Sequence, residues 1–153
     1  MSNLVELLGE TLQSQNGTVE TNTLYKYRYV AFYFAAGWEP NCINFTKKLI
    51  DFYNQVRGED EAAFEVVFVS SDDDQATFEN HYAQMPWLSL SYDKEVFQNL
   101  FTSYDVEKIP TVILVNRDCD IVTRDLKNNI EYKGLGAFEY MQTHFYSPKK
   151  GDT

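Results

Sequence analysis

Residues 32–42 read Phe32-Tyr33-Phe34-Ala35-Ala36-Gly37-Trp38-Glu39-Pro40-Asn41-Cys42, and they decide the fold. The apolar run that ends here predicts a strand over residues 29–35, buried on both faces. Apolar side chains then recur at helical spacing, so a helix is expected over about residues 41–56, ending at Gly58. Cys42 is thus expected at a strand-to-helix junction, and helix N-termini are where thiolates are stabilised.

The rest of the chain alternates strands and helices in the same manner. Buried strands are expected at residues 64–69 and 109–115, the latter pairing with an antiparallel strand at 121–124. The remaining expected elements are a short helical turn at 4–8, a short strand at 18–21, a helix through Phe78 and Tyr82, a helix at 95–104, and a last helix after Gly136 carrying Phe138, Met141 and Phe145. This order predicts an α/β fold with a central mixed β-sheet flanked by helices.

The composition is typical of one packed domain. The chain has 153 residues, of which 44% are hydrophobic and 16% aromatic, enough to bury a substantial core. We expect a single domain over residues 1–147 and a frayed tail over residues 148–153.

The charge balance restricts the partners. The net charge of -10 disfavours nucleic acid and anionic membrane surfaces, because both require clustered cations. No apolar run approaches the ~20 residues of a membrane span, and the first residues lack the pattern of a signal peptide. With only two cysteines, the chain is expected to be cytoplasmic.

Three segments together resemble one known family. They are the stretch that ends in Trp38-Glu39-Pro40-Asn41-Cys42, the strand from Phe64 with the later Met85-Pro86-Trp87-Leu88, and Val106-Glu107-Lys108-Ile109-Pro110-Thr111. The chain resembles thioredoxin-fold proteins of the tryparedoxin and nucleoredoxin group over roughly residues 4–122. The resemblance implies a thioredoxin-like fold and thiol–disulfide oxidoreductase chemistry.

The resemblance also shows what is missing at the junction. Members of the group usually read Trp-Cys-Pro-Pro-Cys, whereas here Glu39 occupies the place of the first cysteine. In thiol–disulfide exchange the first cysteine attacks a disulfide and the second resolves the mixed disulfide. Cys42 is the second one, so it is expected to be more buried, with a pKa raised by the Glu39 carboxylate. It is either a small buried residue, which we favour, or the candidate catalytic nucleophile.

The active-site loop, residues Trp38, Glu39, Pro40 and Asn41, has a structural interpretation of its own. A carboxylate at a helix N-terminus gains ~0.3–1 kcal/mol from the helix dipole, so Glu39 is a fixed anion where a thiolate would be. The alternative role, a general acid or base, lacks a neighbouring histidine in the sequence. Pro40 suits a helix start because its missing N–H is not needed there.

A substrate groove is the second implication of the resemblance. It would make Pro110 a cis proline and present the backbone of Ile109 to an extended substrate; the alternative is a rigid turn that starts a strand. Trp38, Trp87 and Tyr33 are candidates to line this groove, although aromatic side chains more often belong to the core.

Other chemistry-bearing residues give weaker hypotheses. Asp72, Asp73 and Asp74 are expected to cap a helix rather than to bind a metal, since the spacing of a Ca²⁺ loop is absent. His81 and His144 have no zinc-ligand spacing around them, so neither a metal nor a cofactor is expected.

The family resemblance and the expected hairpin turn each give one further hypothesis. Arg124 and either Asp72 or Asp73 are the nearest matches to the residues with which tryparedoxins engage a glutathione-type substrate. Cys119 is expected on an exposed hairpin turn, accessible to oxidation and far from Cys42.

Two functions remain open at this point. The preferred hypothesis is a redox-inactive binding or regulatory module of the tryparedoxin-like type, with a protein or low-molecular-weight thiol as its partner. The alternative is a monothiol thiol–disulfide oxidoreductase that uses Cys42 with glutathione-type thiols. A minor third idea lets Cys119 supply a second thiol across a dimer.

Overall fold

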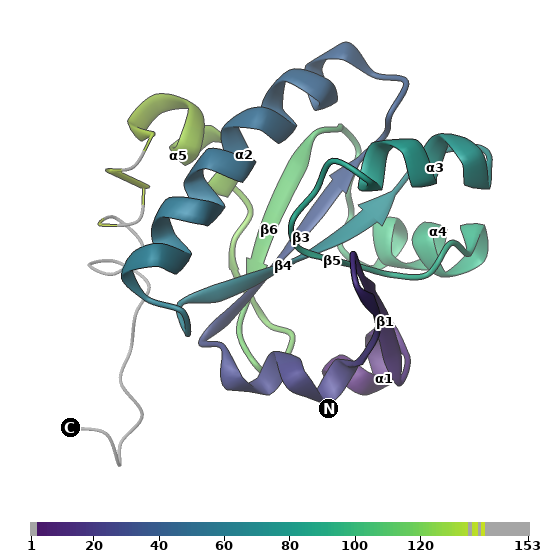
Figure 1. Ribbon diagram of the computed structural model, residues 1–153, viewed down its shortest axis with the longest axis horizontal. Coiled ribbons are helices and arrows are strands. Elements are labelled where there is room, and N and C mark those ends of the chain that lie inside the picture. Colours follow the sequence, from purple (N-terminus) through teal and green to yellow (C-terminus); the bar gives the residue numbers. More distant parts are fainter. Residues whose placement is uncertain (1–2, 135, 138, 140–153) are drawn as a thin grey trace.

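The fold is organised around strand β3 (Tyr29–Ala35), in which every residue is buried. The computed structural model describes residues 3–134, 136, 137 and 139. Its elements, drawn in Figure 1, are α1 (Leu4–Leu8), β1 (Thr11–Ser14), β2 (Gly17–Glu20), the 3-10 helix η1 (Thr21–Lys26), β3 (Tyr29–Ala35), α2 (Pro40–Glu59), β4 (Phe64–Ser70), α3 (Gln75–Tyr82), β5 (Leu88–Ser89), α4 (Lys94–Ser103), β6 (Thr111–Val115), β7 (Ile121–Thr123) and α5 (Leu126–Lys133).

The strands form one mixed sheet. Its order is β2-β1-β5-β4-β3-β6-β7. The central strand β3 pairs in parallel with β4 and antiparallel with β6, so both its edges are satisfied. The α/β class with a central mixed sheet is therefore confirmed.

Helices cover both faces of the sheet, as the alternation of side chains along β3 requires. Tyr33 packs edge-to-face on Phe45 of α2, with ring centroids 5.9 Å apart. Its neighbour Phe34 points to the other face and packs on Phe101 of α4 at 4.9 Å. Helices α2 and α4 therefore lie on opposite faces, and α5 lies beside α2 (Figure 1).

The structure differs from the sequence-based expectation at several elements. β1 and β2 form an N-terminal hairpin that β5 joins to the sheet, where only one strand at residues 18–21 was expected. Helix α2 continues through Gly58 to Glu59, since an interior glycine costs only ~1 kcal/mol when the helix packs well. Strand β6 begins at Thr111, so Ile109 and Pro110 belong to the loop before it.

The C-terminal part of the chain holds an unexpected helix. Helix α5 precedes Gly134 and buries only Leu126 and Ile130, a short apolar stripe among polar residues. The helix expected from Phe138, Met141 and Phe145, and the tail at 148–153, lie outside the described residues. Among the described residues, no helix is both long and apolar enough to cross a membrane.

A partly buried ion pair ties the C-terminal half of α2 to β4. Arg57 Nη1 donates to Glu65 Oε2 at 3.1 Å and to the Tyr53 hydroxyl at 2.7 Å. Tyr53 in turn donates to Glu65 Oε1 at 2.8 Å, and the side chain of Glu65 is only 7% exposed. The Arg57 guanidinium also stacks on Tyr27. This cluster fixes the far end of α2 and thereby the direction of its N-terminus.

We predict that Arg57→Met lowers the free energy of unfolding by about 3 kcal/mol, because it leaves the Glu65 carboxylate buried without its counter-charge. Urea denaturation followed by circular dichroism measures this. Lys48→Met is the matched control: Lys48 pairs with Glu131 while 57% exposed, and such a pair contributes at most ~1 kcal/mol. Equal losses in the two variants would contradict a structural role of the partly buried pair.

Candidate functional site

The N-terminus of α2 is capped by Glu39. Its backbone is extended, and its carboxylate Oε2 accepts a hydrogen bond from the Asn41 amide at 2.9 Å. Pro40 follows at the first helical position, where no N–H is required. Glu39 thus takes the capping role that its position suggested, while Trp38 beside it is 58% exposed.

Cys42 lies one turn inside the helix and is fully buried. Its amide donates to the Glu39 carbonyl at 3.0 Å. The pKa of the Cys42 thiol is raised to about 11, chiefly by burial and also by the carboxylates of Glu39 and Asp72, against a hydrogen bond from Ala36 that lowers it. The expected burial and raised pKa are both confirmed, so at neutral pH Cys42 is a protonated thiol, a poor nucleophile.

Behind Cys42 lies a group of buried polar side chains. The Tyr33 hydroxyl and Thr46 Oγ1 are 2.7 Å apart, and Thr46 donates to the Cys42 carbonyl at 2.8 Å. His81 Nε2 lies 3.4 Å from Thr46 Oγ1. Burial lowers the pKa of His81, so the ring is neutral at pH 7. Sequence reasoning tested His81 only as a zinc ligand and missed its place here, since no local pattern marks it.

Asp72 anchors the active-site loop from the side. Its carboxylate, 2% exposed, accepts from the Gly37 amide at 2.7 Å and from Ser70 Oγ at 2.6 Å. At Gly37 a Cβ atom would come within 3.1 Å of His81 Cβ, so the loop approaches α3 closely enough to favour glycine. Only Asp74 caps α3, through Thr77. The expected capping of the helix is therefore confirmed for Asp74, whereas Asp72 holds the active-site loop.

A groove opens between α2 and α5, next to the Ile109–Pro110 peptide, which is cis as expected. This α2–α5 groove measures about 580 Å³, and its lining includes Asn41, Phe45 and Lys48 of α2, Ile109 and Pro110 of the loop, and Lys127 of α5. Asn41 therefore connects the active-site loop to the groove.

Two aromatic residues do not take the expected place in a groove. Tyr33 and Trp87 are 0% and 1% exposed and pack edge-to-face on each other in the core. The pleat of β3 turns Tyr33 inward against Phe45, which excludes it from any surface. Of the three aromatic candidates only Trp38 is exposed, and it does not line the α2–α5 groove.

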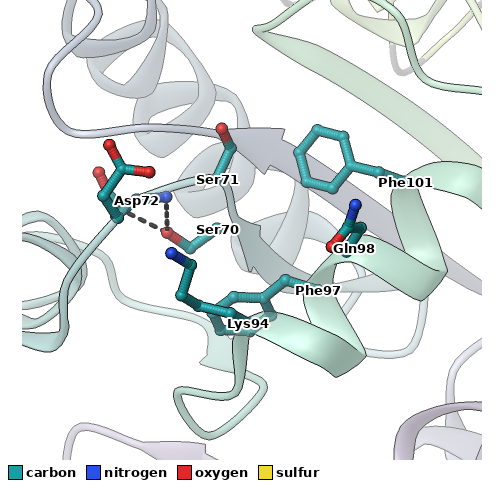
Figure 2. A pocket seen from close by; sticks show the side chains of 8 residues that line it. Ser70, Ser71, Asp72, Lys94, Phe97, Gln98 and Phe101 are labelled. Carbon is teal, nitrogen blue, oxygen red and sulfur yellow. Dashed lines mark hydrogen bonds between the residues drawn. The ribbon is translucent and has the colours of Figure 1, made fainter.

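A second hollow lies against α4, on the other face of the sheet. This α4 pocket measures about 280 Å³, and Figure 2 shows Ser70 and Asp72 opposite Lys94, Phe97 and Phe101. Asp72 lines this pocket, whereas Arg124 lines the α2–α5 groove. The two residues matched to a glutathione-type site are thus not brought into one cavity.

The remaining sequence candidates lie apart from the junction. Cys119 is half-buried in the turn before β7 with a positive φ of 69°, and neither cysteine forms a disulfide. Burial and the carboxylates of Asp118 and Asp120 raise the pKa of Cys119 to about 11. Over the described residues, no three His, Cys, Asp or Glu side chains gather as a metal site would require, and His144 lies outside them.

Comparisons with known proteins agree with this geometry. Residues 27–121 match the sequence profile of a family described as thioredoxin-like. Among curated proteins, the chain is 34% identical to a probable nucleoredoxin 1 of Arabidopsis thaliana over 113 residues and 33% identical to the nucleoredoxin of Danio rerio over 120 residues. These alignments cover 74% and 78% of the chain but only 19% and 28% of the relatives, so the chain spans a fifth to a third of their length.

Two solved structures are similar over almost their entire length. Native tryparedoxin I from Crithidia fasciculata has 36% sequence identity and a TM-score of 0.81, with 88% of this chain and 94% of that chain covered. Tryparedoxin II complexed with glutathionylspermidine has 31% identity and a TM-score of 0.79, covering 86% and 93%.

Replacing the capping carboxylate tests its structural role. We predict that Glu39→Gln lowers the free energy of unfolding by about 0.3–1 kcal/mol, because the charge that interacts with the helix dipole is lost. Urea denaturation measures the change, with the exposed loop residue Glu61→Gln as the matched control. A loss no greater than that of the control would contradict the capping role.

Thiol reactivity tests the environment of the two cysteines. We predict that iodoacetamide at pH 7.5 alkylates Cys119 before Cys42, because only Cys119 is partly exposed. Peptide mass spectrometry at timed intervals resolves the two sites, and urea-unfolded protein gives the free-thiol rate. Alkylation of native Cys42 at the free-thiol rate would show that the thiol is neither buried nor of raised pKa.

Proposed function

The chain belongs to the thioredoxin-like family, in the tryparedoxin and nucleoredoxin group of oxidoreductases, and we propose that it acts as a partner-binding module without dithiol turnover. The proposal takes residues 1–147 as one domain and its location as cytoplasmic. The partner is a protein or a low-molecular-weight thiol compound, in line with the glutathionylspermidine that the related tryparedoxin II was solved with.

The state of Cys42 is the observation that carries the proposal. Attack on a disulfide requires a thiolate with access to solvent. Cys42 is 0% exposed, and with a pKa of about 11 only about one thiol in ten thousand is ionised at pH 7. The partly exposed position at the helix start is held by Glu39, which cannot form a disulfide.

The features that could hold a partner segment also support the proposal. The cis peptide at Pro110, the N-terminal turn of α2 and the α2–α5 groove are all present. The buried Gly37–Asp72 hydrogen bond keeps the loop in place without any cysteine at its tip. A surface that can hold a substrate segment is therefore retained where the attacking group is absent.

The alternative function is a monothiol oxidoreductase, favoured by the position of Cys42 between two groove-lining residues, Asn41 and Phe45. In that reaction the Cys42 thiolate attacks a disulfide, forms a mixed disulfide with one sulfur and releases the other as a thiolate. A glutathione-type thiolate then attacks the mixed disulfide and releases Cys42 again. Both steps require an opening of the helix start, since the sulfur is enclosed.

Two assays distinguish the binding module from the monothiol enzyme. One follows the reduction of insulin by dithiothreitol, and the other follows the reduction of a glutathione mixed disulfide with glutathione as donor. We predict that the wild type and Cys42→Ser do not exceed the uncatalysed rates. Glu39→Cys should raise the insulin reduction rate at least tenfold, because a cysteine at the helix start is partly exposed and stabilised as a thiolate, with Cys42 one turn away to resolve the mixed disulfide.

The control is Glu61→Cys, which adds a thiol in an exposed loop away from the junction. It should leave both rates unchanged. Wild-type activity that disappears in Cys42→Ser would reject the binding-module proposal and establish the monothiol enzyme.

A further inference from the structure

The α2–α5 groove concentrates positive charge in an acidic protein. The chain carries 13 Lys and Arg against 23 Asp and Glu. Four of those cations, Lys48, Lys108, Arg124 and Lys127, line this one groove, and among the described residues that line it Glu131 is the only carboxylate. The α4 pocket, by contrast, has a single cation in its lining, Lys94.

Most of this charge is not neutralised within the described residues. Glu131 is shared between Lys127 at 2.8 Å and Lys48 at 3.6 Å. Arg124 donates to the backbone carbonyl of Asp105, a neutral acceptor. The Lys108 side chain is exposed and forms no ion pair in the described part of the chain. By contrast, Arg57 and Arg28, away from the groove, each pair with a carboxylate.

One of these cations also acts on the junction. Lys127 lowers the pKa of the Cys42 thiol, although its effect is smaller than those of burial and of the Glu39 and Asp72 carboxylates. The lining of the groove includes Asn41, whose amide donates to the Glu39 carboxylate, and extends past Ile109 to α5. A bound segment would therefore lie along the loop with its charged groups toward α5.

The uncharged part of the lining suits an extended peptide. Side-chain amides of Asn41, Asn44 and Asn128 can donate to and accept from a peptide backbone, while the partly exposed Ile109 supplies apolar contact. The lining has no exposed aromatic ring for a base to stack on, since Phe45 is 2% exposed. Single-stranded nucleic acid depends on such stacking and is further repelled by the net charge of -10.

We propose that the α2–α5 groove binds an extended, acidic segment of a partner protein, whose carboxylates meet Lys108, Lys48 and Lys127. The inference deepens the proposed binding function, because it names the kind of partner that the same site selects. It does not depend on the redox state of Cys42, so the binding and the turnover can be tested separately.

Fluorescence anisotropy with three labelled ten-residue peptides tests the proposal. The peptides are identical except that four positions are all glutamate, all glutamine or all lysine. We expect the glutamate peptide to bind at least fivefold tighter than the glutamine peptide and the lysine peptide not to bind. Raising the salt from 50 to 300 mM should weaken the glutamate peptide, because exposed charge pairs are screened.

Charge reversal locates the binding surface. Lys108→Glu should weaken the glutamate peptide about three- to tenfold, since it replaces one attractive contact by a repulsive one. Lys47→Glu is the matched control: it changes the net charge equally on an exposed residue of α2 that does not line the groove. The control should bind within twofold of the wild type.

Several results would overturn the inference. One is equal binding of the glutamate and glutamine peptides, or no binding at millimolar concentration. Another is an equal effect of Lys108→Glu and Lys47→Glu on binding. A third is tighter binding of a ten-nucleotide oligothymidine or of reduced glutathione than of the glutamate peptide. A catalytically active wild type that still selects the glutamate peptide would reject the proposed loss of turnover and leave the groove assignment standing.

Discussion

The hydrogen bond from the Gly37 amide to the buried Asp72 carboxylate is the constraint on which the site depends. It joins the loop after β3 to the residues after β4, two strands that already pair along their whole length. Asp72 is itself held by Ser70 Oγ, so the anchor is rigid. Everything at the tip of the loop, including the Glu39 cap and the start of α2, takes its position from this tie.

The contacts that hold the loop in place are separate from the groups that would carry out thiol chemistry. The loop is held by backbone and side-chain hydrogen bonds at its base, and the helix start is capped by a carboxylate. Neither the Gly37–Asp72 hydrogen bond nor the Glu39 cap involves a sulfur atom, so the fold of the junction does not depend on a cysteine at position 39. The Glu39 carboxylate also places a negative charge near Cys42, which makes the thiol harder to ionise.

Much of the fold could be predicted from the sequence because its decisive signals are local. The buried run of β3 and the helical spacing from Phe45 onward identify the junction, and Asp74 shows its capping role by its position before α3. The hairpin of β1 and β2 was missed although Asn16-Gly17 is a turn signal, because its strands are short and largely exposed. Helix α5 buries too few apolar residues to show a period.

The site was predictable only in part, because several of its residues come together through tertiary packing of distant segments. Burial of Cys42 follows from its place one turn inside a helix, whereas the meeting of His81, Thr46 and Tyr33 behind it depends on tertiary packing. The cations of the α2–α5 groove come from α2, the loop before β6, and the segment around α5, so no window of the sequence contains them. The overall net charge of -10 gives no indication of them, because it averages over the whole chain.

The two tryptophans of the chain stand in opposite surroundings, and this gives the protein two separate optical reporters. Trp38 is 58% exposed at the tip of the active-site loop, so its emission should lie at long wavelength and respond to a molecule that covers the loop or to an added quencher. Trp87 is 1% exposed between Tyr33 and Tyr53, so its emission should lie at short wavelength and change only when the core opens. Occupancy of the loop and integrity of the fold can thus be followed in one sample without any label.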